Sequence, residues 1–310
     1  MPPAVLLMGP TASGKTALAL ELAARLPLSI ISVDSAQIYR DMNIGSAKPD
    51  QQTLERFPHR LINILSPEES YSAARFRQDA LKAMDEIVAD GQVPLLVGGS
   101  MLYFRALQEG LADLPQADAA LRRSIEEEAA ERGWPALHAE LERIDPQTAR
   151  RLAPNDQQRL QRALEVYRLT GQTISCLLAA SRPSPPPYRL FSLALIPEDK
   201  TVLRARITER FGTMLEAGLV EEVRNLQARY RLHVGLPSMR CVGYRQAWEY
   251  LAAPQPSPLE DLRIRGTHAT CQLAKRQMTF VRSLAATQLD SLRIDLSTIV
   301  YNRIAAFIGS

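Results

Sequence analysis

Cysteine, lysine and long hydrophobic runs are all scarce in this chain of 310 residues. Its three cysteines, Cys176, Cys241 and Cys271, are an odd number without metal-ligand spacing, which predicts free or buried thiols and excludes a disulfide-rich or zinc-binding domain. No apolar run reaches the roughly 20 residues that a membrane helix requires. The first residues lack the basic region of a signal peptide, so we expect a cytoplasmic protein with no membrane partner.

Lysine supplies only five of the 37 basic residues, and the other 32 are arginine. Residues 1–149 hold 14 basic and 21 acidic side chains, a balance of −7, whereas residues 150–282 hold 21 and 11, a balance of +10. Arginine suits phosphate contacts, so the basic second half favours a polyanionic partner. A GC-rich genome also produces arginine-rich chains, so the charge alone leaves the partner open.

One glycine motif determines the chemistry of the N-terminal region. Residues 9–16, GPTASGKT, match G-x-x-x-x-G-K-[ST] between an apolar run at 4–8 and a helical pattern that ends before Pro27. Backbone N–H groups in such a loop turn inward onto phosphate oxygens, and the following helix adds its positive end. We therefore predict a phosphate cradle formed by Gly9, Pro10, Thr11, Ala12, Ser13, Gly14, Lys15 and Thr16, with Thr16 as a ligand of Mg²⁺.

Further apolar runs at 28–33 and 93–97 alternate with helical patterns, including an amphipathic segment at 76–87. This alternation predicts an α/β fold with a P-loop-type parallel sheet. From residue 113 to about 181 only helical patterns occur, at 121–131, 136–144 and 156–169. We expect an all-helical insertion at 113–187, closed by the proline-rich linker 182–187, between two parts of the catalytic core at 1–112 and 188–310. The second part should open with a strand at 188–195 and continue as helices, with a break at 254–258.

Two further strand ends carry polar side chains. Asp34 ends the second run, and strand ends in such sheets face the ligand, so its carboxylate is a candidate Mg²⁺ ligand or general base. A turn or helix-cap aspartate is the alternative. The third run ends in Gly98-Gly99-Ser100 without the acidic residue usual in ATPases. Those glycines allow close backbone approach to a ligand and Ser100 offers a hydroxyl, although a simple turn would use the same residues.

The order and spacing of seven stretches resemble the tRNA dimethylallyltransferase family, the isopentenyl transferases that act on tRNA. The stretches are GPTASGKT (9–16), DSAQIYRDMNIGSAKP (34–49), PHRLINILSPEESYSAARFR (58–77), GGSMLYFRALQEGL (98–111), NDQQRLQRALEV (155–166), MRCVGYRQAW (239–248) and QLAKRQMTFVR (272–282). The resemblance implies a prenyltransferase that moves a dimethylallyl group from dimethylallyl diphosphate to the exocyclic N6 of the adenosine immediately 3′ of the tRNA anticodon, position 37. Its cofactor would be Mg²⁺, and a monomer is expected.

The resemblance also assigns residues. Asp34 would accept the proton from the adenine amine, with Ser100 bonded near it, while Lys15 would stabilise the leaving diphosphate. Arg206 and Arg210, spaced i,i+4 on one helical face, are candidates for a diphosphate clamp, with Arg210 catalytic. Contacts to tRNA, and to its anticodon stem-loop above all, would come from Asp34, Ser35, Ala36, Gln37, Ser100, Arg122, Gln158, Arg159, Leu160, Gln161, Arg162, Arg240, Cys241, Val242, Gly243, Tyr244, Arg245, Lys275, Arg276 and Gln277. Without the family resemblance, each single arginine could equally be a solvated surface charge or a member of an internal ion pair rather than an RNA contact.

Three other functions remain open on the sequence. A P-loop small-molecule kinase would place ATP in the cradle and turn over nucleotide. An isopentenyl transferase acting on free adenine nucleotides would share residues 9–16 and 34–39. A non-catalytic RNA-binding module would leave Lys15, Thr16 and Asp34 without a role. The helical insertion and its arginine-rich faces favour a macromolecular acceptor over the first two.

Overall fold

The computed structural model describes residues 1–181, 184–255 and 258–309, which form two compact units. One unit comprises Met1–Gln108 with Pro186–Ser310, and the other is the segment Glu109–Pro185 between them. The sequence placed these boundaries at 112/113 and 187/188, a few residues later. Residues 182–183 of the expected linker and 256–257 of the expected break lie outside the described residues.

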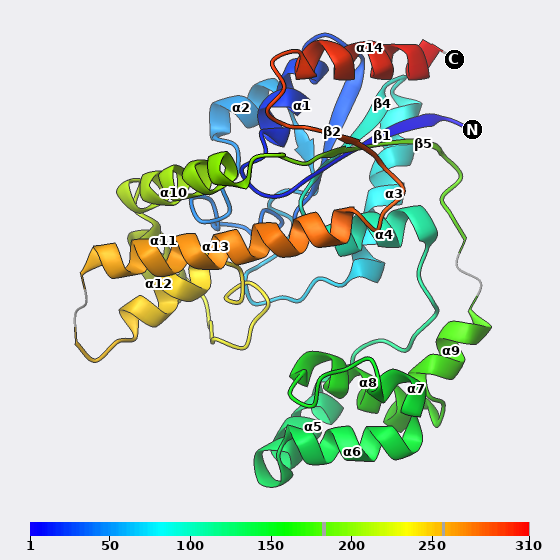
Figure 1. Ribbon diagram of the computed structural model, residues 1–310, viewed down its shortest axis with the longest axis vertical. Helices are drawn as coiled ribbons and strands as arrows, with labels where there is room; N and C mark the ends of the chain where they lie inside the picture. The colour runs from blue at the N-terminus through cyan, green and yellow to red at the C-terminus, as the bar shows by residue number, and fades with distance from the viewer. Residues whose placement is uncertain (182–183, 256–257, 310) are drawn as a thin grey trace. The chain divides into compact units, whose positions relative to one another are not determined.

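A parallel six-stranded sheet forms the centre of the larger unit (Figure 1). Its order is β3-β2-β4-β1-β5-β6, so β1 lies between two strands that come from before and after the insertion. The strands are β1 (Pro3–Met8), β2 (Leu28–Val33), β3 (His59–Arg60), β4 (Val93–Gly98), β5 (Arg189–Leu195) and β6 (Thr287–Leu289). Four strands match the predicted runs, and the P-loop-type parallel sheet is confirmed.

Two short strands depart from the sequence prediction. The expectation that everything after 195 is helical is wrong at β6, where Thr287 and Leu289 pair with Leu193 and Leu195 of β5. The segment is too short to show a strand period, and only its last residue is buried. β3 was not predicted for the same reason, because two half-buried residues carry no pattern.

Helices cover both faces of the sheet. The larger unit contains α1 (Lys15–Ala23), α2 (Gln51–Arg56), α3 (Ala73–Ala89), α4 (Met101–Glu109), α10 (Lys200–Glu216), α11 (Leu219–Arg229), α12 (Tyr244–Leu251), α13 (Leu259–Val281) and α14 (Leu296–Gly309). The α3 helix begins where Ser72 accepts a hydrogen bond from Arg75 N, and it buries the five apolar side chains that the amphipathic pattern predicted. Across the described ranges no helix is both long and apolar enough to cross a bilayer.

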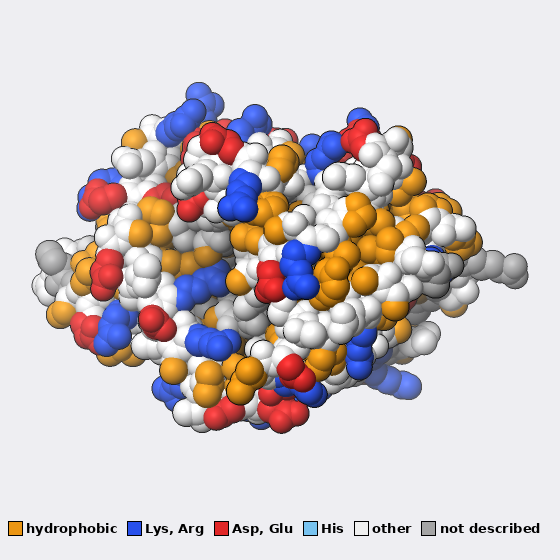
Figure 2. All heavy atoms as spheres, turned by 90° about the horizontal axis from the view of Figure 1, so that it is seen from above, with side chains coloured by type: hydrophobic (Ala, Val, Ile, Leu, Met, Phe, Trp, Pro, Cys, Tyr) orange, Lys and Arg blue, Asp and Glu red, His pale blue; other side chains and the backbone are white. Residues whose placement is uncertain are grey.

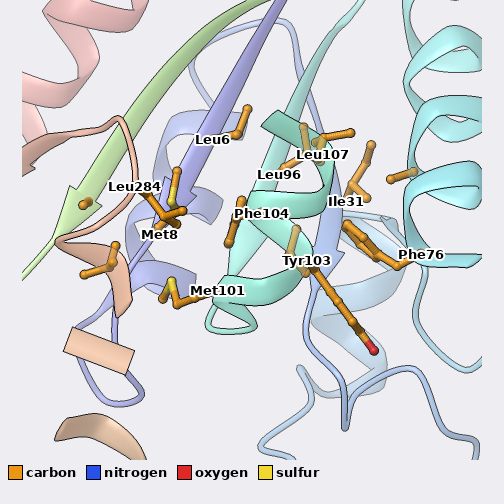
Figure 3. Close-up of a cluster of buried hydrophobic side chains, with 14 of the residues drawn as sticks. Leu6, Met8, Ile31, Phe76, Leu96, Met101, Tyr103, Phe104, Leu107 and Leu284 are labelled. Atoms are coloured by element: carbon orange, nitrogen blue, oxygen red, sulfur yellow. The ribbon is translucent and has the colours of Figure 1, made fainter. Parts of the chain in front are cut away.

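The core on one side of the sheet joins α3, α4 and α13 to the central strands. In Figure 3, Phe104 and Met101 of α4 point to the sheet beside Met8 and Leu96. The rings of Phe76 and Tyr103 stack with centroids 4.5 Å apart. A second core, on the other face, packs α1 and α14 against β1 and its neighbours. These two layers fix the ends of β1, β2 and β4, from which the site is built.

Glycine lets the carboxyl ends of β2 and β4 approach closely. A Cβ atom at Gly98 would stand 1.9 Å from the carbonyl oxygen of Val33, which is impossible without displacing a strand. Gly266 of α13 leaves room for the ring of Phe211 in α10. A Cβ atom at Gly266 would be 1.9 Å from that ring. Both glycines are therefore required by contact distance rather than by backbone angle.

The second unit is helical throughout its described part, as predicted for the insertion. Its helices are α5 (Ala119–Arg132), α6 (Trp134–Ile144), α7 (Pro146–Ala149), α8 (Gln157–Thr170) and α9 (Ile174–Ala180). They share a core of their own that includes Ile125, Leu137, Leu141, Leu160 and Leu164. An independent core means that this unit holds its shape by its own packing.

Charge of both signs is spread over the surface. On the face that Figure 2 shows, Lys and Arg side chains alternate with Asp and Glu side chains, and hydrophobic side chains lie between them. The basic side chains on this face therefore do not gather into one continuous patch. A polyanion would meet them as separate charges rather than as a single basic surface.

Candidate active site

The loop at residues 9–16 joins the end of β1 to the start of α1, the context that the motif requires. Gly14 caps α1 with φ 85°, a left-handed conformation that favours glycine. A Cβ at Gly9 would stand 2.5 Å from the carbonyl oxygen of Leu195, so glycine is needed there for space. The loop brings backbone N–H groups and the N-terminus of α1 to one place, which suits an anion.

Lys15 lies half-buried inside this loop. Its Nζ donates to the carbonyl oxygen of Pro10 at 2.6 Å and to Ser13 Oγ at 3.4 Å. Burial, and next the positive charge of Arg210, lower the pKa of Lys15 to about 7, while the negative charge of Asp34 opposes the shift. An anion bound beside the ammonium would favour its charged form, so this site is suited to a phosphate group.

Arg210 of α10 is the second cation of the site. Burial lowers its pKa below the usual range, and the charge of Asp34 opposes that change. Arg206, one turn earlier on the same helix, is exposed. The charges of Arg210, Lys15 and Asp34 therefore act on one another, whereas Arg206 is an exposed side chain for which no such interaction is found among the described residues. A diphosphate clamp formed by both arginines stays a prediction.

Asp34 stands at the end of β2, where its neighbours hold one side of the carboxylate. Oδ1 accepts from Ala36 N at 2.8 Å and from Gln37 N at 3.3 Å, so Asp34 does make the turn that was the alternative explanation. Among the described residues Oδ2 has no hydrogen-bond partner. Burial raises the pKa of the Cys241 thiol to about 12, and the negative charge of Asp34 adds to the rise.

The turn after β4 supplies a hydroxyl to the same place. Ser100 Oγ accepts from Ser35 N at 3.0 Å, which ties the end of β4 to the segment that comes after Asp34. Gly98, Gly99 and Ser100 stand where a nucleotide hydrolase usually carries an acidic residue. The site thus combines a phosphate cradle with a carboxylate and a hydroxyl, and this combination suits transfer from a phosphorylated donor to a weakly acidic acceptor.

Gln277 of α13 lies against the loop rather than on the outer surface. Its Oε1 accepts from Thr11 N and its Nε2 donates to the Gly99 carbonyl oxygen, each at 2.9 Å. Lys275 and Arg276, the other two predicted contacts on this helix, are exposed. Of these three, only Gln277 is engaged inside the protein, a role that the sequence did not indicate.

The residues after Asp34 differ in whether their side chains are exposed or hydrogen-bonded within the protein. Ser35 is exposed and Ala36 is half-buried. The amide of Gln37 is engaged internally, because its Oε1 accepts from Ser32 Oγ at 3.0 Å and its Nε2 donates to the carbonyl oxygens of Ser46 and Ala47. A base contact by Gln37 stays a prediction and requires the exchange of those bonds.

The segment 240–245 shows the same division. Arg240 and Arg245 are exposed, and Arg245 pairs with Glu249 at 3.0 Å. Tyr244 is fully buried, and its hydroxyl donates to Glu222. Val242 and Cys241 are half-buried, whereas Gly243 is buried at the N-terminus of α12. RNA contacts here stay predictions, and the two exposed arginines are the side chains best placed to make them.

Glu222 of α11 organises the loop after Asp34, a role that no local sequence pattern indicated. Its carboxylate accepts from the backbone N–H groups of Asn43, Ile44 and Gly45 at 2.8–3.2 Å. This buried cluster around residues 38–47 includes Tyr244. The three bonds to one carboxylate hold the backbone of residues 43–45 in a fixed shape.

In the insertion, Glu165 is fully buried and joins two of the predicted RNA contacts. Arg122 donates to it from Nε at 2.9 Å and from Nη2 at 3.1 Å, Arg162 donates from Nη1 at 2.7 Å, and the backbone N–H of Asp118 adds a fourth bond. The internal ion pair, which was the alternative for single arginines, is thus present. The signal in the sequence was a glutamate between Leu164 and Val166 on the buried side of a helix.

The remaining insertion residues differ in exposure. Leu160 is buried in the core, and Gln161 donates to the Arg122 carbonyl oxygen and to Glu126. Gln158 and Arg159 are exposed. Contacts to RNA by this helix stay predictions, and they fall most directly on the two exposed side chains.

Thr16 fits one part of a magnesium site. It is exposed in the first turn of α1, beside Lys15. Within the part of the chain that the structure describes, no three His, Cys, Asp or Glu side chains gather as metal ligands. Mg²⁺ commonly takes one or two protein oxygens and completes its shell with substrate phosphates and water. A single hydroxyl next to a phosphate cradle is consistent with that mode.

A family model, the sequences of relatives and a solved structure all relate this chain to the same family. The model of the IPP transferase family matches residues 37–284. The tRNA dimethylallyltransferase of Dechloromonas aromatica is 58% identical over the whole chain and 98% of its own length, and that of Thiobacillus denitrificans is 57% identical over the same shares. The crystal structure of the tRNA isopentenylpyrophosphate transferase from Bacillus halodurans, 34% identical, matches all of this chain and 97% of that one with a TM-score of 0.71.

Proposed function

The chain belongs to the IPP transferase family, and we propose that it transfers a dimethylallyl group from dimethylallyl diphosphate to N6 of the adenosine immediately 3′ of the anticodon in tRNA, position 37. The observation that carries this proposal is the grouping of Lys15, Arg210, Asp34 and Ser100 around one loop end. Two cations and a cradle of amides serve a diphosphate, and a carboxylate serves the acceptor amine. No acidic residue follows β4 to serve nucleotide hydrolysis.

The donor half of the reaction breaks a carbon–oxygen bond. The bond between C1 of the dimethylallyl group and the diphosphate oxygen breaks, and the electron pair leaves with the diphosphate. Lys15, Arg210 and the backbone N–H groups of the loop stabilise the charge that develops on that oxygen. Because Lys15 has a pKa of about 7 without an anion, the diphosphate itself brings this lysine to its charged state.

The acceptor half forms a carbon–nitrogen bond. The N6 lone pair attacks C1, and one N6 proton passes to Asp34, whose Oδ2 has no other partner among the described residues. Ser100 Oγ, already an acceptor from Ser35 N, can donate its own proton nearby and orient the base. Such a positioned base contributes roughly 10²–10⁴-fold in rate. The products are N6-dimethylallyladenosine in tRNA, diphosphate and a proton.

Mg²⁺ is proposed as the cofactor. Thr16 would hold it, together with oxygens of the diphosphate. When bound, the ion neutralises charge on the leaving group. The protein's own contribution is to keep Thr16 at the start of α1, directly after Lys15.

The adenosine must leave its stack to reach a carboxylate at the end of a strand, so we propose that the base is flipped. Backbone contacts position a nucleic acid and base contacts specify it. We assign backbone contacts to the exposed Gln158, Arg159, Arg240, Lys275 and Arg276, and recognition of the flipped base to Ser35 and Gln37. The relatives from Dechloromonas aromatica and Thiobacillus denitrificans are tRNA dimethylallyltransferases by name, which supports this acceptor.

The test is transfer of label from radioactive dimethylallyl diphosphate, with Mg²⁺, to unmodified tRNA and, in a parallel reaction, to AMP. Label in tRNA alone, at the adenosine next to the anticodon, supports the proposal. Label in AMP would transfer the assignment to a small-molecule acceptor. ATP hydrolysis without any label would support the kinase alternative and overturn the proposal.

A further inference from the structure

The side chain of Gln277 joins two loops that carry different halves of the site. Thr11 belongs to the diphosphate cradle after β1, and Gly99 belongs to the turn after β4. Gln277 reaches both from α13, with its oxygen 2.9 Å from Thr11 N and its nitrogen 2.9 Å from the Gly99 oxygen. Each end of the amide is therefore engaged, one as an acceptor and one as a donor.

From Gly99 the connection continues to the catalytic carboxylate. Ser100, the next residue, accepts from Ser35 N at 3.0 Å, and Ser35 comes directly after Asp34. Asp34 in turn is held by the backbone N–H of Ala36. An unbroken series of short hydrogen bonds and peptide units thus runs from the cradle to the proposed base, and Gln277 is its only side-chain link between β1 and β4 among the described residues.

We infer that Gln277 is a positioning residue, which sets the separation between the diphosphate cradle and the acceptor groups Asp34 and Ser100. This inference rests on the proposed function. An attack at C1 needs donor and acceptor atoms at near-attack distance, and a misplacement of about 1 Å can cost about 100-fold in rate. Gln277 acts through the two loops and contacts neither the amine nor the diphosphate in this assignment.

The chemistry of the contact selects an amide. Only a group with an acceptor and a donor at the same distance from the backbone satisfies both Thr11 N and the Gly99 oxygen. A carboxylate accepts from Thr11 but cannot donate to Gly99, and a thioether of similar length does neither. Gly99 must lack a side chain as well, because its Cβ would stand 2.5 Å from Gln277 Nε2.

The test compares Gln277→Met and Gln277→Glu with Gln272→Met and Gln272→Glu. Gln272 is an exposed glutamine on the same helix, outside the site, and serves as the matched control. Steady-state and single-turnover transfer of label to tRNA are measured for all four variants and the original chain. We expect both Gln277 variants to lose about 10- to 100-fold in kcat with KM for tRNA within about twofold, and both Gln272 variants to keep the original values.

The outcomes separate a positioning role for Gln277 from a direct contact with RNA and from no role in the reaction. An increase in KM for tRNA at unchanged kcat would make Gln277 an RNA contact and overturn the inference. Full kcat in Gln277→Met would overturn it as well. Gln277→Glu is included in case Gln277→Met is unstable, because the glutamate keeps the bond from Thr11 N. If Gln277→Glu melts at the temperature of the original chain but has a lower kcat, the result supports positioning. If its kcat equals that of the original chain, the inference is refuted. Failure of the original chain to transfer label would instead refute the proposed function.

Discussion

The hydroxyl of Tyr244 donates to the carboxylate of Glu222 at 2.6 Å, and that carboxylate also binds the backbone of the loop at residues 43–45, which follows β2. Burial raises the pKa of Tyr244 well above its usual value, and the charge of Glu222 adds to the rise. The tyrosine thus stays a neutral donor. A motif residue that the family resemblance associated with RNA is therefore part of the support of residues 43–45.

Replacing Glu222 by Gln should destabilise this loop. The amide keeps one acceptor but loses the charge that satisfies three backbone N–H groups and a hydroxyl, a cost of about 1–3 kcal/mol in the free energy of unfolding. Glu221→Gln, at an exposed residue that pairs with Arg224, is the control and should change the free energy of unfolding by less than about 0.5 kcal/mol. Denaturant unfolding measures both, and equal stabilities would contradict the assigned role.

Asp34→Asn tests the base directly. Asparagine keeps the size and the turn bond to Ala36 N but cannot accept the amine proton, so kcat should fall by about 10²–10⁴. Binding of tRNA, measured by filter retention or mobility shift, should stay within about threefold because one charge near the base is a small part of the contact. A variant with normal kcat would remove Asp34 from the mechanism.

The lowered pKa of Lys15 predicts that the protein takes up a proton when it binds the donor diphosphate. The pKa of Lys15 in the free protein is lowered to about 7, and a bound anion raises it, so the lysine gains a proton on binding at pH 8 but is already largely charged at pH 6. Inorganic diphosphate itself titrates in this range, so calorimetry in buffers of different ionisation enthalpy compares the original chain with Lys15→Met. The original chain should take up on the order of 1 proton more than Lys15→Met at pH 8, and nearly the same number at pH 6. Equal uptake by the two chains at pH 8 would contradict the prediction.

In the insertion, Glu165→Gln should weaken the helical unit. The change removes a buried charge that two arginines and one backbone N–H share, and it should lower the free energy of unfolding by about 2 kcal/mol. Limited proteolysis should then cut faster within residues 109–185 than in the rest of the chain. Glu127→Gln, exposed on α5, is the control, and equal cleavage of the two variants would contradict the prediction.

Salt dependence distinguishes the exposed arginines near α12. Arg240 has no ion-pair partner among the described residues, whereas Arg245 pairs with Glu249. If Arg240 binds a phosphate, Arg240→Ala should reduce the slope of log K against log salt for tRNA by about 0.7–0.9. Arg245→Ala should change the slope less, because its charge is already compensated. An unchanged slope for Arg240→Ala would place it outside the interface.

Local patterns in the sequence predicted part of the fold and the centre of the site. Apolar runs located four strands, and the spacing of Phe76, Ala80, Ala83, Met84 and Ile87 located the buried face of α3. The glycine motif placed the cradle because loop geometry there depends on adjacent residues alone.

The features that the sequence did not show depend on distant partners. Gln277 meets Thr11 across 266 positions, and Glu222 meets Ile44 across 178. Neither side chain differs locally from a surface residue, so only the folded chain reveals them. β6 was missed for a related reason, since a three-residue strand is defined by its neighbour β5 and not by its own period.

The position of β1 in the sheet affects the order in which the fold can form during synthesis. Its two neighbours are β4, complete at residue 98, and β5, which starts only at residue 189. A ribosome that adds about 5–20 residues per second needs roughly 5–20 s for the intervening segment. During that interval β1 is the edge strand of the nascent sheet, and its backbone on the side of β5 is unpaired. The insertion can fold before β5 is added. The helical unit thus also shortens the gap that the chain must close before the sheet is complete.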